Sequence, residues 1–544
     1  MEDNKPTGLA KYKVWEPLLL AIMVILGMFA GQKMTQHEDG PSSLTRSEKE
    51  KSKAGDRIEE LIKFVESRYV DDVDADALVQ NAIEAVLSEL DPHSSYLPPD
   101  QVIELDAKMR GNFEGIGVEF DQFDDTLVVI HVIEEGPAMR AGIRPGDKLL
   151  SANDSTLIGA MDDQNRLLKQ LKGKKGSKVV LGIRRSGETE LLNIEVTRDV
   201  IPIYSIPAAF MIDDQNGYIK IDRFSSTTYK EFMDAVERMF DQEGMKNLVI
   251  DVRENPGGYL QEAVNILSQL FDERNKLIVY TEGEHSKRTE YKTTGNQFFD
   301  IHKVTVLIDQ GSASASEIVA GAIQDHDRGI IIGTPSFGKG LVQEQYKLSN
   351  GGALRLTIAR YFTPSGRLIQ RPYDAESDQD HITYYLGNDS VKSLDSTQFF
   401  TSNGRIVYGE GGIKPDIEVE NRLNWRDPSM VNLYTGMVRF AISYLEKTEA
   451  GEGLDVETFR SKLPSDEALL ESYSTFLEKL PLENQVDLAQ FENDVDIAVL
   501  LRSSIMSYQF GHAQWYREMV KIDPLVMKAM EVLKSEMQYS EQLN

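Results

Sequence analysis

The spacing of apolar and polar residues differs between parts of the chain. Residues 55–110 carry apolar side chains at helical spacing, and residues 425–544 return to that spacing. Between about 199 and 424, short apolar strands such as 217–222 and 246–252 alternate with amphipathic stretches. This pattern predicts an α/β multidomain protein, in which a layered α/β core lies between an N-terminal helical region and a C-terminal helical domain.

The amino terminus carries an uninterrupted apolar run. Residues 18–30 contain no polar side chain, and basic residues precede them. This length suits either a signal-peptide core or a short membrane span, and the poor small-residue cleavage pattern favours an uncleaved anchor. Residues 1–31 are therefore expected to form a membrane anchor or signal segment, and the polar residues 32–54 a flexible linker. The charge pattern predicts a body held at the inner membrane in a bacterial-type periplasm, or secreted there after signal cleavage.

The composition excludes several classes of function. The chain has 59 basic and 88 acidic residues and a net charge of −29, which repels phosphate backbones, so nucleic acid is not an expected partner. Without cysteine there is no disulfide framework, no thiolate nucleophile and no zinc–thiolate cluster. The histidines follow no metal-binding spacing, and neither a metal nor a cofactor is expected.

Ser314 lies at a junction that suits both a helix cap and a catalytic hydroxyl. Residues 304–308 are typical of a buried strand, 309–311 of a turn and 317–325 of a helix. Ser314 and Glu317 also fit the Ser-x-x-Glu capping box, which gives Ser314 a purely structural interpretation. The same position offers main-chain N–H groups and the positive end of a helix dipole to an oxyanion. Small residues on both sides would let a peptide backbone approach, which a simple cap does not need.

Lys339 is the candidate base for that hydroxyl. Its loop, Gly333-Thr-Pro-Ser-Phe-Gly-Lys339, nearly spells a phosphate-binding loop, but Gly340 stands where the magnesium-binding hydroxyl belongs. A lysine can act as a base when burial lowers its pKa from about 10.4, and apolar neighbours are compatible with burial here. An exposed lysine in a flexible turn is the alternative. Histidine cannot take the role, because His326 would lie roughly 18 Å from Ser314 along the predicted helix.

A third element, residues 248–258, is an apolar strand that runs into Asn-Pro-Gly-Gly. The main-chain amides of such a turn can point into a cleft and stabilise an oxyanion. Glycines that merely permit positive φ angles would give the same pattern. The sequence does not separate Gly257 from Gly258 as the donor.

Residues 111–198 resemble a PDZ domain. The loop Gly115-Ile116-Gly117-Val118 is followed, at that family's spacing, by a Gly-Pro-Ala and a Pro-Gly-Asp motif. In PDZ domains this loop offers main-chain amides to the terminal carboxylate of a peptide, and the next strand pairs with the peptide. The resemblance therefore implies that Gly115, Ile116, Gly117 and Val118 bind a chain end.

Together these motifs resemble the carboxy-terminal processing peptidases, also called tail-specific proteases, from about residue 55 to about 422. Further matches are Leu-Asp-Pro-His-Ser-Ser-Tyr-Leu at 90–97 and Gly-Glu-Gly-Gly-Ile-Lys-Pro-Asp at 409–416. The resemblance implies a crotonase-like α/β protease core at 199–424 with an inserted PDZ domain. Glu254 is a small departure, because the family often carries an uncharged residue there.

The resemblance also assigns roles to single residues. It implies that Ser314 is the nucleophile, Lys339 the general base and Gln343 the residue that orients the base. It also implies two oxyanion donors, which are the main-chain amide of Ala315 and that of either Gly257 or Gly258. A straight strand would place Gln343 roughly 13 Å from Lys339, so a bend near Gly340 is required.

The implied function is that of a serine endopeptidase with a Ser-Lys dyad, whose PDZ domain captures unstructured, apolar carboxy termini of protein substrates. The alternative is a membrane-tethered PDZ scaffold or ligand-binding protein on an inactive protease fold, which would bind such termini without cleaving them. A C-terminal apolar stripe with Leu433, Met437 and Phe440 lies outside the resemblance. It serves either internal packing or a partner, such as a second copy of the chain or an adaptor protein.

Overall fold

The structure is a computed structural model of the 544-residue chain. It describes residues 46–123, 125–153, 155–158, 169–372, 397–409, 411–420, 428–448, 453–480, 488–491 and 496–544. The chain forms two compact units, residues 1–86 and 87–544.

The described part of the first unit consists of helix α2 (Arg46–Arg68) and most of helix α3 (Ala75–Ser88). Helix α2 begins inside the segment that was expected to be a flexible linker, residues 32–54. Residues 46–54 are rich in Lys and Glu, which are good helix formers, and this explains why they extend the helix. Along α2, Leu61 and Phe64 keep much of their apolar surface exposed.

The predicted anchor at residues 1–31 lies outside the described residues, as does most of the predicted linker. Within the described residues, no helix is long and apolar enough to cross a membrane. The membrane anchor therefore stays a prediction.

A six-stranded sheet forms the centre of the second unit, in the order β10-β11-β12-β15-β16-β21, and only the edge strand β10 runs antiparallel to its neighbour. The strands are β10 (Ala208–Met211), β11 (Asn216–Lys220), β12 (Asn247–Asp251), β15 (Lys303–Ile308), β16 (Ile330–Gly333) and β21 (Ile417–Glu418). The inner strands are buried on both faces, as parallel strands covered by helices require.

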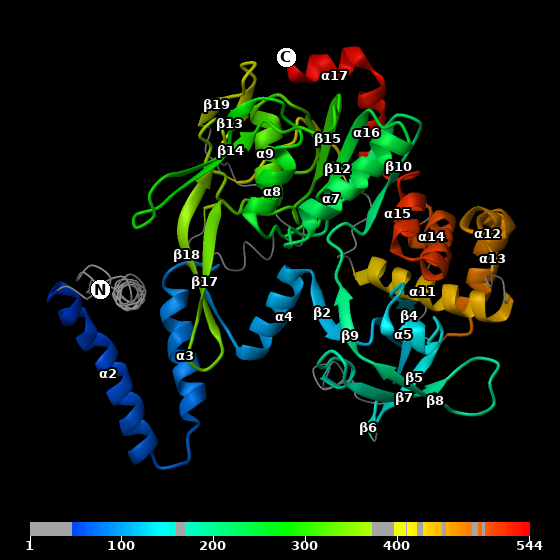
Figure 1. Cartoon of the computed structure of the whole chain (residues 1–544), viewed down its shortest axis with the longest axis horizontal. Helices are drawn as coiled ribbons and strands as arrows, with labels where there is room; N and C mark the ends of the chain where they lie inside the picture. Colours follow the sequence, from blue (N-terminus) through cyan, green and yellow to red (C-terminus); the bar gives the residue numbers. More distant parts are fainter. Residues whose placement is uncertain are drawn as a thin grey trace, which may run out of the picture. The chain divides into compact units, whose positions relative to one another are not determined.

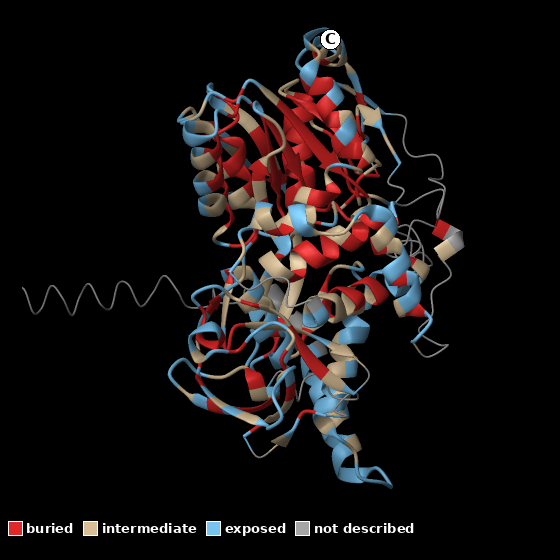
Figure 2. Ribbon diagram, turned by 90° about the vertical axis from the view of Figure 1, so that its right-hand side faces the viewer, coloured by how far each residue is buried: buried red, intermediate tan, exposed pale blue. Residues whose placement is uncertain are grey.

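Helices cover both faces of this sheet (Figure 1). One face carries α7 (Thr228–Glu237, followed by a π-helical turn at Arg238–Gln242), α8 (Leu260–Leu267) and α9 (Ala315–Asp325). The opposite face carries α16 (Pro524–Lys534). Buried residues concentrate in this layered core (Figure 2).

A second sheet flanks the core in the order β1-β18-β13-β14, with β17 paired to β18. Its strands are β1 (Ser95–Leu97), β13 (Arg274–Glu282), β14 (Thr289–Thr294), β17 (Leu341–Lys347) and β18 (Ala353–Phe362). Strand β1 lies within residues 55–110, where the sequence predicts a helical region. Pro98 and Pro99 disfavour a helix just before them, and α4 (Pro99–Arg110) starts at the second proline. A small hairpin of β19 (Gln398–Phe400) and β20 (Ile406–Tyr408) completes the core.

The predicted PDZ region folds as a separate antiparallel sheet in the order β3-β4-β5-β7-β8. Its elements are β3 (Val118–Phe123), β4 (Thr126–Val132), α5 (Pro137–Ala141), β5 (Lys148–Ala152), β6 (Ser155–Thr156), β7 (Lys178–Arg184) and β8 (Leu192–Thr197). Strand β2 (Asn112–Gly115) pairs with β9 (Asp199–Pro202), so the domain continues past residue 198. Strand β3 is an edge of the described sheet.

The C-terminal region is helical, as its periodicity predicts. It contains α11 (Pro428–Thr448), α12 (Val456–Lys462), α13 (Asp466–Leu477), a 3₁₀ turn (Leu488–Phe491), α14 (Ile497–Phe510), α15 (His512–Met519), α16 and α17 (Glu536–Leu543). The stripe that includes Leu433, Met437 and Phe440 is buried in a core shared with Val128 of the PDZ sheet. Internal packing, rather than a free partner surface, therefore accounts for this stripe.

Candidate active site

Ser314 occupies the sharp turn between β15 and α9. Its φ of 54° and ψ of −112° lie where side chains other than glycine are strained. Residues 311–325 are buried except for Ser314, which is partly exposed. The turn therefore presents one hydroxyl at the surface of an otherwise closed segment, a geometry typical of a nucleophile at a strand-to-helix junction.

Glu317, which the sequence marked only as part of a capping box, is fully buried and has a larger role. Its carboxylate accepts the main-chain N–H of Ser314 at 2.8 Å, which is the expected half of the box. It also accepts the N–H groups of Gly338 at 2.7 Å and Lys339 at 2.9 Å, and the Ser336 hydroxyl at 2.6 Å. Burial raises the pKa of Glu317, while these donors oppose the rise. One carboxylate thus joins the serine turn to the lysine loop.

Lys339 lies in a partly buried environment that favours its neutral form. Burial is the main cause that lowers its pKa to about 8, and the positive charge of Arg355 is the second. Its Nζ donates to Oε1 of Gln343 at 2.8 Å. The Tyr361 hydroxyl adds a further link, because it contacts the carbonyl oxygens of both Ser314, at 3.1 Å, and Lys339. The burial expected of a lysine base is present.

Gln343 meets Lys339 although a straight strand would keep the two apart. Strand β17 begins only at Leu341, and its register with β18 shifts between Val342 and Gln343. The Gln343 amide in turn donates to the carbonyl oxygen of His93, in the loop before β1. The orienting contact thus depends on a segment far away in the sequence.

The glycine turn lies against the start of α9. A Cβ on Gly257 would come within 2.8 Å of the Ala313 carbonyl oxygen and of Ser314 Cβ, so only glycine fits there. The Gly257 N–H is already donated to the Asn255 side chain at 2.8 Å. In the described part of the chain, the N–H groups of Gly258 and Ala315 have no such acceptor. Of the two glycines that the sequence left open, Gly258 is the one with a free amide.

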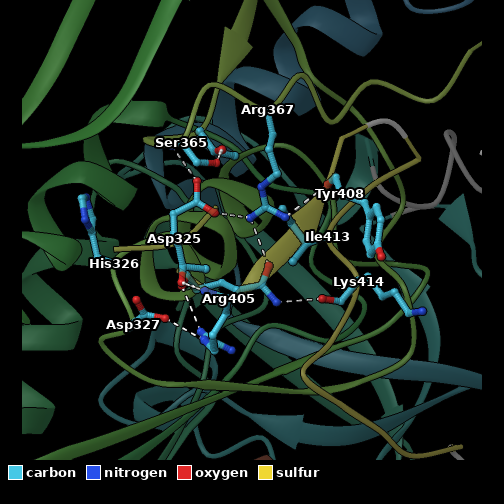
Figure 3. Close-up of polar contacts among 12 residues, drawn as sticks. Asp325, His326, Asp327, Ser365, Arg367, Arg405, Tyr408, Ile413 and Lys414 are labelled. Carbon is cyan, nitrogen blue, oxygen red and sulfur yellow. Dashed lines mark hydrogen bonds and ion pairs between the residues drawn. The ribbon is translucent and has the colours of Figure 1, made fainter. Parts of the chain in front are cut away.

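The far end of α9 is fixed by a buried polar cluster (Figure 3). Asp325 and Arg367 form an ion pair in which both side chains are only 1% exposed. Asp325 also accepts the Ser365 N–H at 2.9 Å. A few residues further along the chain, Gln370 accepts the N–H of Gly340 at 2.9 Å. Both ends of α9 are therefore connected to the loop that carries Lys339.

A second charged cluster lies just before the glycine turn, around the end of β12. Arg253 lies between Asp251 and Asp523, with 2.8 Å to Asp523. Asp251 also accepts the Tyr218 hydroxyl at 2.7 Å, and Lys220 donates to the Arg253 carbonyl oxygen at 2.6 Å. Asp523 belongs to the C-terminal region, which therefore reaches the base of the turn.

The predicted peptide-binding loop of the PDZ domain lies between β2 and β3. Gly117 has a φ of 77°, and the Ile116 and Gly117 carbonyls accept N–H groups from the segment around α5, which fixes the loop. The loop leads directly into the edge strand β3.

The residues that sequence reasoning missed are those whose contacts join segments distant in the chain. The Ser-x-x-Glu motif was visible for Glu317, but nothing in the motif indicated the three donors from the lysine loop. Tyr361 and Arg367 carried no signal at all, because their partners lie elsewhere in the chain. Only tertiary contacts disclose their positions.

Comparison with known proteins relates three parts of the chain to described families. Residues 215–380 match peptidase family S41, residues 115–196 a PDZ domain, and residues 21–100 the N-terminal domain of the activating protease CtpB.

Whole proteins show the same relationship. The chain is 32% identical over 352 residues to the carboxy-terminal processing protease CtpB of Bacillus subtilis (strain 168), which covers 63% of this chain and 72% of that protein. It is 34% identical over 333 residues to the carboxy-terminal-processing protease of Bartonella bacilliformis, with 60% of this chain and 75% of that protein covered. The solved structure of the photosystem II D1 C-terminal processing protease is 26% identical and covers 66% of this chain and 85% of its own, with a TM-score of 0.34.

Proposed function

The chain belongs to the carboxy-terminal processing proteases of peptidase family S41, which are serine endopeptidases, and we propose that it cleaves protein substrates with Ser314 as nucleophile and Lys339 as general base. Gln343 orients the lysine. The PDZ domain selects the substrate by its carboxy terminus.

The observation that carries this proposal is that Lys339 has a lowered pKa and a side chain held in place. Burial lowers the pKa of Lys339 to about 8, so its amine is neutral far more often near physiological pH than the amine of an exposed lysine, and a general base must be neutral. Its Nζ is held by Gln343 at 2.8 Å, and its main chain shares the Glu317 carboxylate with Ser314. A lysine in a mobile surface turn would have neither constraint.

The reaction would proceed in two stages. The neutral Lys339 amine accepts the Ser314 hydroxyl proton while the Ser314 oxygen attacks the scissile carbonyl carbon, and the N–H groups of Ala315 and Gly258 receive the oxyanion. Lys339 then gives the proton to the leaving amine as the C–N bond breaks, which leaves an ester on Ser314. Water, deprotonated by Lys339, attacks this ester. Lys339 then returns the proton to the Ser314 oxygen as the acyl C–O bond breaks, which frees Ser314 and releases a carboxylic acid that ionises in water.

The PDZ domain would bind the substrate tail by strand addition. Strand β3 is an edge of the described sheet, so its unpaired main-chain groups are available to an extended peptide. The loop Gly115-Ile116-Gly117-Val118 would hold the terminal carboxylate. An unstructured tail suits this mode, because a folded terminus cannot present main-chain groups along a strand; apolar side chains are the expected preference.

The sequence supports a location outside the cytoplasm. The apolar run within residues 1–31 would act as an inner-membrane anchor or a cleaved signal, which places the enzyme in a periplasm-like compartment. Absence of cysteine is compatible with that compartment. A second copy of the chain or an adaptor protein remains the proposed class of protein partner.

Cleavage of an unfolded protein with an apolar carboxy terminus tests the proposal. The full chain, Ser314→Ala, Lys339→Ala and, as a matched lysine control, Lys347→Ala are compared by mass spectrometry of the fragments. Lys347 lies on β17 with its side chain 76% exposed. We expect fragments from the wild type and Lys347→Ala only. Cleavage by Ser314→Ala would refute the nucleophile, and intact substrate with the wild type, despite peptide binding, would indicate the inactive scaffold.

A further inference from the structure

Arg355, on strand β18, is a half-buried cation without an acidic partner. Two other arginines of the core are matched to carboxylates, because Arg253 lies between Asp251 and Asp523 and Arg367 is paired with Asp325. A third, Arg328, has no carboxylate partner in the described part of the chain but donates to main-chain carbonyl oxygens. In the described part of the chain, the Arg355 guanidinium forms no ion pair and donates no hydrogen bond. Burial lowers its pKa, and no neighbouring carboxylate opposes that effect. In a protein with a net charge of −29, the missing partner is notable.

The register of the sheet places Arg355 beside the active site. Gln343, which holds the lysine, pairs with Thr357, and Gln345 pairs with Arg355, without a register shift between these pairs. Residues two apart on a strand share a face and lie roughly 7 Å from each other. Arg355 is therefore on the same face as Gln343, and Lys339 experiences its positive charge.

The acidic side chain that contacts Thr357 on this face is already committed. Asp91 accepts the N–H groups of His93 and Ser94 at 2.9 Å each, the Ser94 hydroxyl at 2.7 Å and the Thr357 hydroxyl at 3.1 Å. It leaves Arg355 without an internal counter-ion. A guanidinium held away from bulk water favours a carboxylate that it can bind with two parallel N–H groups.

We propose that Arg355 is a specificity-determining residue that binds an acidic side chain of the substrate next to the Ser314–Lys339 site. This inference rests on the proposed function of that site. The carboxylate comes from a Glu or Asp side chain near the scissile bond, because the terminal carboxylate of the substrate is taken by the PDZ loop. The enzyme would thus read two features of one chain: an apolar tail through the PDZ domain and an acidic residue at the cleavage site.

Paired peptides test the subsite. Each pair ends in the same apolar tail and differs only by Glu or Gln at one position, and successive pairs move that position across the scissile bond. The ratio of kcat/KM for Glu over Gln is measured with the full-length wild type, Arg355→Gln and Arg355→Lys. Arg360→Gln, an exposed arginine on the same strand, is the matched control. Because the measurement is a ratio on one enzyme, a change in Lys339 reactivity cancels.

We expect the wild type and Arg360→Gln to prefer Glu by about 10-fold or more at one position, as a charge-assisted pair would give. Arg355→Gln should bring that ratio to about 1, and Arg355→Lys should keep part of it. A wild type with no preference at any position, or a preference that survives in Arg355→Gln, would overturn the inference. If Arg355→Gln does not fold, the Glu/Gln ratio of kcat/KM for Arg355→Lys decides. A ratio unchanged from the wild type overturns the proposed binding of the carboxylate by two parallel N–H groups of Arg355.

The proposed function fails in a different way. If neither peptide of any pair is cleaved by the wild type, or if Ser314→Ala cleaves them equally, the catalytic assignment is wrong. Cleavage that depends on Ser314 but ignores the Glu/Gln exchange refutes Arg355 alone. A peptide with an amidated carboxy terminus distinguishes the role of the terminal carboxylate from that of the Glu side chain. It should bind the PDZ domain more weakly, while the Glu/Gln ratio of kcat/KM is retained.

Discussion

Glu317 and Lys339 are joined through the lysine main chain: Oε2 of Glu317 accepts the Lys339 N–H at 2.9 Å, and the same oxygen accepts the Ser314 N–H at 2.8 Å. The candidate nucleophile and base therefore share one acceptor atom. Their relative position is set by main-chain contacts to a buried carboxylate, while their side chains stay available for chemistry.

Replacement of Glu317 by Gln should separate the two loops. An amide turns one oxygen into an NH₂ group that faces N–H donors, so at least one buried donor loses its acceptor at a cost of about 1–3 kcal/mol. We expect kcat to fall about 100-fold or more and the melting temperature to fall as well, measured by peptide cleavage and thermal unfolding. Glu344→Gln, an exposed exchange on β17, is the control. Wild-type kcat in Glu317→Gln would contradict the shared-acceptor role.

Activity should rise as the pH increases through about 8. Lys339 must be neutral to accept the proton of Ser314, and its pKa is lowered to about 8 by burial first and by the Arg355 charge second, against Glu317 and Asp91, which raise it. Removal of the cation in Arg355→Gln favours the protonated lysine, so the rising limb of kcat/KM should move to higher pH. A full pH profile of kcat/KM with a Gln-containing peptide measures the rising limb of the wild type and its displacement in Arg355→Gln. A limb that is unmoved, or that moves to lower pH, would contradict the electrostatic coupling.

Gly257→Ala should abolish turnover without loss of the fold. The new Cβ would lie 2.8 Å from the Ala313 carbonyl oxygen and Ser314 Cβ, so the serine turn would have to move. We expect less than roughly 1% of wild-type kcat, since loss of one oxyanion contact alone costs about 10²–10³-fold. Gly244→Ala is the control, because Gly244 also has a positive φ, of 80°, but nothing lies within 4 Å of its Cβ position. Equal losses in both variants would point to backbone strain instead.

Asp523→Asn should weaken the attachment of the C-terminal region to the core. Asp523 caps α16 by accepting the Leu525 N–H at 2.9 Å and also pairs with Arg253 at 2.8 Å. Asn keeps the cap and loses the charge, so we expect a destabilisation of about 1–3 kcal/mol, measured by chemical denaturation. Asp496→Asn changes a cap of α14 that pairs with no arginine among the described residues, and it should be nearly neutral. Equal stability of the two variants would show that the Arg253 contact contributes nothing.

The sequence predicts those parts of the fold that are governed by local pattern. The strand, turn and helix around Ser314 follow from apolar runs and turn residues, and α9 appears as Ala315–Asp325 where a helix over 317–325 was expected. The C-terminal helices follow from periodicity in the same way. The polar composition of residues 46–54 predicts a flexible linker, but they belong to α2, because polar composition alone does not separate a linker from a helix.

The rest of the site depends on contacts between distant segments. Gln343 meets Lys339 because β17 begins only at Leu341 and its register shifts between Val342 and Gln343. Gln343 is also held by His93, 250 positions away in the chain. Strand β1 was missed because three residues carry too little pattern to distinguish a strand from a loop. The proposal of Gly258 rather than Gly257 as oxyanion donor rests on the Asn255 side chain, which accepts the Gly257 N–H and which no spacing rule reveals.

The single carboxylate of Glu317 also determines how the candidate active site unfolds locally. Because the turn that carries Ser314 and the loop that carries Lys339 are bound to the same buried group, neither can loosen while the other keeps its native contacts. Local opening of this region should therefore be one cooperative event. During gradual heating, the two loops should become susceptible to hydrogen exchange and to protease nicking at the same temperature, as a single mechanical part would.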